Sequence, residues 1–68
     1  MERKHYSFEG CGSQKIQGVT IYQGWYSESD MVKIAIGIVI GLRRYCKGAS
    51  IKVYEEMGEE WHLVRVQE

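Results

Sequence analysis

The sequence predicts a small α+β domain in which one helix packs on one face of a four-stranded antiparallel sheet, in the order β-β-α-β-β. Four short segments alternate apolar and polar residues, as half-buried strands do. A longer central segment carries helix signals at both of its ends. The 68 residues suit a single domain, residues 1–68, because a chain of this length supports one small hydrophobic core.

The first two strands are expected at residues 5–9 and 15–23, where apolar and polar residues alternate. Residues 10–13 (GCGS) contain two glycines and predict the loop between the strands. In the second strand, we expect Val19 and Ile21 to face the core.

The central helix is expected from about residue 28 to residue 47. Ser27 and Asp30 fit an N-terminal capping box, and Gly48 is a suitable C-terminal stop. Successive side chains on a helix are separated by about 100°, so apolar residues three and four apart should form one core stripe. The predicted stripe comprises Met31, Ala35, Ile38, Val39, Leu42 and Tyr45, flanked by Ile34 and Cys46.

The residues on the opposite side of this helix predict a contact surface between two copies of the chain. A sheet covers only one side of a helix, so Ile36 and Ile40 should remain uncovered. Two interior glycines each cost about 1 kcal/mol relative to alanine, and their four-residue spacing permits close approach of a second backbone. In the alternative interpretation, residues 24–26 cover the two isoleucines. The predicted helix interface comprises Lys33, Ile36, Gly37, Ile40, Gly41 and Arg44.

The last two strands are expected at residues 50–55 and 61–67. Ile51 and Val53 alternate with polar residues and should face the helix. The last strand permits two registers. The favoured register directs Val64 and Val66 toward the core and Trp61, Leu63 and Arg65 outward, whereas a bulge would switch the direction midway.

The sheet face turned away from the helix is expected to carry aromatic and cationic side chains. Such residues dominate the energetics of protein interfaces, and aromatic rings on a bare sheet also stack nucleic-acid bases. Cross-strand packing that only shields the sheet is a third interpretation. The predicted sheet-face interface comprises Tyr22, Lys52, Tyr54, Trp61 and Arg65, beside Thr20.

Charge is segregated along the chain, although nine basic and nine acidic residues give a net charge of zero. Residues 33–52 contain five basic residues and no acid, whereas residues 55–68 contain five acids and one arginine. Zero net charge weakens the case for nucleic-acid binding. In one variant of a protein-binding role, an acidic hairpin competes with nucleic acid for a basic groove on a target protein. This hairpin comprises Glu55, Glu56, Glu59 and Glu60.

The chain carries few signals of catalysis or metal binding. Cys11, Cys46, His5 and His62 lack the close ligand pairs of zinc sites, and no glycine-rich phosphate loop is recognisable. We therefore expect no enzymatic activity, no metal and no cofactor. The charged N-terminus and the lack of an apolar run of about 20 residues predict a cytoplasmic protein with reduced thiols and no membrane contact.

The sequence therefore predicts a non-enzymatic protein-binding module that docks on a partner protein as a homodimer. An inhibitor, adaptor or regulator role fits its size, which is typical of proteins encoded by phages and mobile elements. One alternative is a structural subunit of a larger assembly. Another is a nucleic-acid-binding module that combines the aromatic face with Arg43, Arg44, Lys47 and Lys52.

Overall fold

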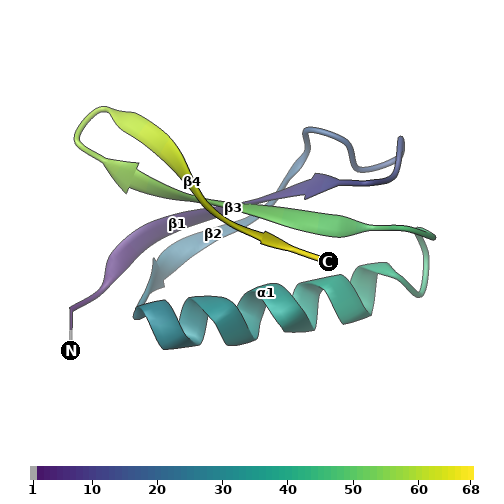
Figure 1. Cartoon of the computed structure of the whole chain (residues 1–68), viewed down its shortest axis with the longest axis horizontal. Helices are drawn as coiled ribbons and strands as arrows, with labels where there is room; N and C mark the ends of the chain where they lie inside the picture. Colours follow the sequence, from purple (N-terminus) through teal and green to yellow (C-terminus); the bar gives the residue numbers. More distant parts are fainter. Residues whose placement is uncertain (1) are drawn as a thin grey trace.

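The computed structural model describes residues 2–68 and contains one four-stranded antiparallel sheet and one helix (Figure 1). The strands lie side by side in the order β2-β1-β3-β4, and α1 runs along one face of the sheet. This architecture confirms the predicted α+β class and the order β-β-α-β-β. The elements are β1 (Lys4–Cys11), β2 (Thr20–Tyr26), α1 (Glu28–Leu42), β3 (Ser50–Met57) and β4 (Glu60–Gln67).

The core lies between α1 and the two central strands. Tyr6 and Phe8 of β1 and Ile51 and Val53 of β3 are at most 1% exposed. Full burial of a large apolar side chain contributes about 1.5–3 kcal/mol to stability. The helix residues in the same cluster are Met31, Ala35 and Val39, with Ile34, Ile38 and Leu42 partly buried against them.

The helix begins where the sequence predicts. Ser27 Oγ accepts a hydrogen bond from the backbone N–H of Asp30 at 3.3 Å, which satisfies a donor that the helix itself leaves unpaired. Glu28 and Asp30 in the first turn complement the positive end of the helix dipole. Within residues 2–68, no helix is long and apolar enough to cross a membrane.

The helix ends at Leu42, five residues before the predicted end at residue 47. Residues 43–47 form tighter turns, and Arg43 Nε donates a hydrogen bond to the carbonyl oxygen of Ala49 at 2.9 Å. The prediction that Tyr45 belongs to the core is wrong, because Tyr45 lies in these turns and is 81% exposed. Gly48 still ends the segment, with a φ of +80° that glycine adopts readily.

A bulge in each edge strand changes which face the following side chains occupy. In β2, Tyr22 pairs with Phe8 while Thr20 pairs with Glu9, so Ile21 is the extra residue. In β4, Arg65 pairs with Val53 and Leu63 with Tyr54, which leaves Val64 as the extra residue. Because paired residues share a face, each bulge reverses the expected alternation beyond it.

Two predictions for the second strand are wrong, one because of the bulge and one because β2 begins only at Thr20. Tyr22 lies opposite the core residue Phe8 and therefore on the helix side of the sheet, not on the outer face. Ile21 packs against the core as predicted, but Val19 lies before the strand and is 47% exposed.

The bulge in β4 confirms the alternative register and corrects the favoured one. Arg65 lies opposite Val53, on the helix side, whereas Val66 lies opposite Lys52, on the outer face. Val64 and Val66 are 40% and 51% exposed, so neither is a core residue.

Candidate functional site

The sheet face turned away from α1 presents side chains in three rows that cross all four strands, and we call it the open sheet face. Pairing across the strands defines the rows, because paired residues point to the same side. The rows are Trp25, His5, Glu56 and Trp61, in which a side-chain contact joins His5 to Glu56; then Gln23, Ser7, Tyr54 and Leu63; then Thr20, Glu9, Lys52 and Val66.

The first row is an aromatic surface. The His5 ring stacks on Trp25 with a centroid distance of 4.5 Å and an interplanar angle of 8°, and it contacts Trp61 at 5.1 Å. His5 Nδ1 lies 3.3 Å from Glu56 Oε1, which fixes the imidazole between the two indoles. Trp25 is nevertheless 58% exposed, so much of this apolar surface faces solvent.

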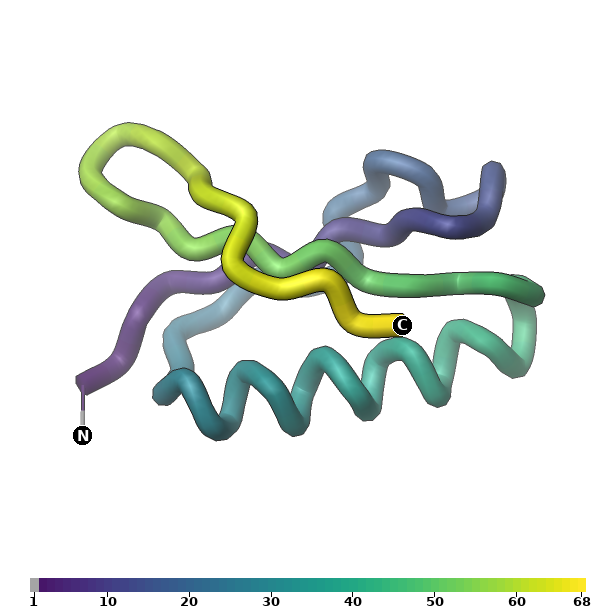
Figure 2. The backbone as a smooth tube through the Cα atoms, viewed as in Figure 1, coloured from purple at the N-terminus to yellow at the C-terminus, as the bar shows by residue number. Residues whose placement is uncertain are grey.

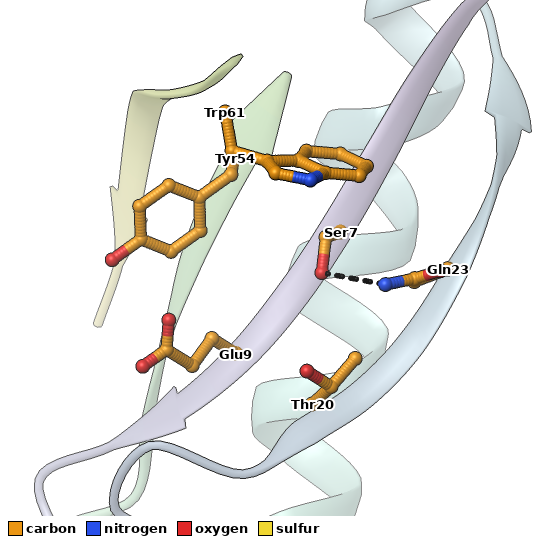
Figure 3. Close-up of a pocket in the computed structure, with 6 residues that line it drawn as sticks. All are labelled: Ser7, Glu9, Thr20, Gln23, Tyr54 and Trp61. Atoms are coloured by element: carbon orange, nitrogen blue, oxygen red, sulfur yellow. Dashed lines mark hydrogen bonds between the residues drawn. The ribbon is translucent and has the colours of Figure 1, made fainter. Parts of the chain in front are cut away.

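The second and third rows surround an open depression of about 360 Å³, which we call the acidic depression. Ser7 is buried at its floor, and Gln23 Nε2 donates a hydrogen bond to Ser7 Oγ at 3.4 Å. The Trp61 indole reaches from β4 over β1 toward this floor (Figure 3). The lining residues are Ser7, Glu9, Thr20, Gln23, Tyr54 and Trp61.

Glu9 gives the acidic depression its charge. Its side chain is half-buried and lies on the face shared with Tyr54, where burial and then the negative charge of Glu9 raise the pKa of the Tyr54 phenol. Lys52 lies directly opposite Glu9 across β1 and β3. Among residues 2–68, however, no cationic group lies within 4.0 Å of the Glu9 carboxylate.

The structure brings together three of the five residues of the predicted sheet-face interface, namely Lys52, Tyr54 and Trp61. Tyr22 and Arg65 lie on the other face because of the bulges. The Tyr22 hydroxyl hydrogen-bonds to that of Tyr26, and the Arg65 guanidinium donates to Gln67 Oε1 at 2.9 and 2.7 Å.

Sequence reasoning missed the indole of Trp25 and the imidazole of His5. The second strand is expected to end at residue 23, whereas β2 continues to Tyr26 and so carries Trp25 on the same face as Gln23. For His5 a signal was present, because it alternates with the apolar residues Tyr6 and Phe8.

A second exposed surface lies on the side of α1 away from the sheet, and we call it the outer helix face. Ile36 and Ile40 are 41% and 59% exposed, so the interpretation in which residues 24–26 cover them is wrong. A Cβ atom at Gly37 or Gly41 would meet nothing within 4 Å. Lys33 shares the helix with these residues, whereas Arg44 lies two residues beyond its end.

The acidic hairpin contains three of its four predicted residues. Glu59 and Glu60 lie at the tip, and Glu56 sits on the open sheet face. Glu55 is instead 9% exposed on the helix side, where its Oε1 lies 3.7 Å from Lys4 Nζ. The strand alternation explains this correction, because Glu55 follows the inward-facing Val53 by two residues.

The two cysteines are free, buried thiols in different surroundings. Cys46 packs with Ile16 and Ala49, whereas His62 lies opposite Glu55 and contacts Glu60 at 3.5 Å. In the part of the chain that the structure describes, no three His, Cys, Asp or Glu side chains are grouped closely enough to hold a metal ion.

No protein-family model matches the chain, and neither the curated proteins nor the solved structures contain a match. A function for this chain must therefore be inferred from the chemistry of the open sheet face, the outer helix face and the acidic hairpin.

Proposed function

We propose that this chain is a non-enzymatic module that docks on a partner protein through the open sheet face and acts as a homodimer. The observation that carries this proposal is the uncovered apolar surface on that face. Trp25, Trp61, Leu63 and Val66 are each at least 40% exposed there. Tryptophan is enriched among the residues that dominate protein interfaces, and the strands hold these side chains on a rigid support.

The mixed charge of the open sheet face supports a protein as the ligand. Glu9 and Glu56 provide two acids, against Lys52 as the cation. A nucleic-acid surface requires an excess of positive charge to displace phosphate counterions. The position of Arg65 on the helix side lowers the positive charge of this face further.

The outer helix face supports a second copy of the chain as its occupant, because the helix and the turns after it are oppositely charged at their two ends. The first turn of α1 carries the acids Glu28 and Asp30, and the basic turns after α1 lie at the other end of the helix, which runs along the long axis of the molecule (Figure 2). A twofold axis that crosses α1 near Ile36 and Ile40 would place the acidic first turn of each helix beside the basic turns of its partner. The basic residues after the helix are Arg43, Arg44 and Lys47.

The glycines of α1 fit the same arrangement. Packing within the chain does not require Gly37 or Gly41, since each faces open space. Antiparallel pairing of two copies of α1 would bring their backbones close at these positions and would also align their helix dipoles favourably. An inhibitor, adaptor or regulator would then carry two copies of the open sheet face, which strengthens binding to a partner with two sites.

Affinity capture with paired aspartate variants tests the proposal. Leu63→Asp places a charge on the open sheet face, and Ile40→Asp places the same charge on the outer helix face at a similar exposure. Proteins captured by the wild type from nuclease-treated lysate should be lost with Leu63→Asp and retained with Ile40→Asp. Circular dichroism of both variants checks that each one folds. Capture of the same proteins by Leu63→Asp would contradict the proposed docking face.

The aromatic row also favours a second candidate, a nucleic-acid-binding module, because three rings side by side on a sheet can stack bases. Tight binding of a labelled single strand that weakens steeply with salt would support this candidate over a protein partner. Oligomers larger than a dimer would instead support a structural subunit of an assembly.

A further inference from the structure

We propose that the acidic depression binds the guanidinium group of an arginine side chain presented by the partner protein. This inference rests on the proposed function and specifies the chemistry of the contact. The acidic depression lies within the open sheet face, so an arginine bound there would sit beside the exposed Trp61 and Leu63 at the centre of the docking surface.

Glu9 supplies the charge for this contact. It is the one acidic or basic residue of the depression's lining among residues 2–68. Its carboxylate is half-buried and has no cation within 4.0 Å, although Lys52 lies in the neighbouring strand. A partly desolvated carboxylate without an ion-pair partner gains most from a charged donor, because charge-assisted hydrogen bonds are about twice as strong as neutral ones.

Two aromatic side chains provide a flat surface for the cation. Trp61 extends its indole over β1, and the Tyr54 ring lies beside the Glu9 side chain (Figure 3). A planar guanidinium stacks on such rings through both cation–π attraction and surface contact. The Tyr54 phenol is neutral at physiological pH, because its ordinary pKa of 10.0 is far above 7 and burial raises this pKa further.

The remaining lining residues offer acceptors for the guanidinium N–H groups. Ser7 and Thr20 contribute hydroxyl oxygens, and Gln23 directs its amide nitrogen to Ser7, so its carbonyl oxygen is left to accept a bond. A guanidinium carries five N–H donors in one plane, whereas a lysine ammonium carries three around a point charge. The row of acceptors beside an aromatic plane therefore favours arginine over lysine. The volume of about 360 Å³ suits one such side chain.

Titration of the isotopically labelled chain, residues 1–68, with a short peptide tests this inference by NMR. The probe is acetyl-Gly-Arg-Gly-amide, and its matched control contains citrulline, which keeps the shape of arginine but carries no charge. We expect saturable shifts of the Trp61 indole N–H and the Gln23 side-chain amide with the arginine peptide. Binding of the citrulline peptide should be weaker by about fivefold or more, as expected for loss of an ion pair and a cation–π contact.

Two matched variants complete the experiment. Glu9→Gln should weaken binding of the arginine peptide by about fivefold, whereas Glu59→Gln removes an equal charge at the hairpin tip and should leave binding unchanged. Equal affinity for the two peptides in the wild type would overturn the inference without recourse to any variant. Unchanged affinity in a folded Glu9→Gln protein would also overturn it.

The two proposals fail in different ways. If Leu63→Asp abolishes capture of the partner while the arginine peptide does not bind, the docking face stands and the arginine site is wrong. If the arginine peptide binds but Leu63→Asp captures the same proteins, the site stands and the proposed docking face is wrong.

Discussion

Tyr6 is the residue that couples folding most directly to alkaline pH. Its side chain is 1% exposed in the core. Burial raises the pKa of its phenol, and the nearby charge of Glu55 raises it further. The folded protein therefore holds the Tyr6 proton more tightly than the unfolded chain does. Above a pH of about 10, the unfolded chain loses this proton first, so the free energy of unfolding falls as the pH rises.

Replacement of Tyr6 by phenylalanine should reduce this alkaline loss of stability. We expect Tyr6→Phe to unfold near the wild-type midpoint at pH 7 and to lose less stability than the wild type between about pH 9 and pH 11. Urea unfolding, monitored by circular dichroism, measures the midpoint at pH 7 and the loss of stability at alkaline pH. Tyr45→Phe is the control, since Tyr45 is 81% exposed. If the free energy of unfolding fell equally with pH in Tyr6→Phe and in the wild type, Tyr6 would not be the source of the alkaline loss of stability.

Single residues also show where sequence reasoning about the candidate site succeeds. Tyr54 and Trp61 lie on the open sheet face as predicted, because simple alternation holds from Ile51 through Tyr54 and again across the hairpin. Glu55 departs from its prediction for the same reason: alternation buries it, whereas its acidic neighbours in the sequence suggested a solvated cluster.

At the scale of the elements, the two edge strands explain most of the corrections. A strand prediction advances in steps of two, so one extra residue reverses every side chain that follows. The bulges at Ile21 and Val64 therefore moved Tyr22 and Arg65 to the helix side and Val66 to the open sheet face. Sequence composition does not mark either bulge, since both extra residues are ordinary β-branched strand formers.

The helix provides a test in which stability and association change in opposite directions. Gly37→Ala should raise the free energy of unfolding of the monomer by about 1 kcal/mol, because alanine favours helix and its Cβ would meet nothing within 4 Å. The same Cβ should weaken a dimer in which two copies of α1 approach closely at this position. Denaturant unfolding at low protein concentration and sedimentation equilibrium measure the two effects.

Gly48→Ala is the control for the helix substitution. Its backbone has a φ of +80°, so alanine there should destabilise the monomer, by about 1 kcal/mol. A Gly37→Ala protein that dimerises as strongly as the wild type would remove Gly37 from the proposed interface.

For the whole molecule, the segregation of charge predicts a salt-dependent dimer. We expect a dimer at micromolar concentration whose dissociation constant rises between roughly 0.05 M and 0.5 M salt, because screening weakens contacts between acidic and basic ends. Ile40→Asp should be monomeric, whereas Leu63→Asp should dimerise like the wild type. Sedimentation equilibrium across the salt series measures these states. A monomeric wild type at low salt would exclude the homodimer.

The sequence by itself determined the element order, the capped start of the helix, its uncovered isoleucines and the separation of basic and acidic segments. Each of these depends on residues close together in the chain, where periodicity and capping act directly. Only the tertiary structure decided the sheet order, the early end of the helix and the assembly of Trp25, His5 and Trp61 into one surface. Those features depend on pairing between distant strands, where a single bulge or a buried turn outweighs local preference.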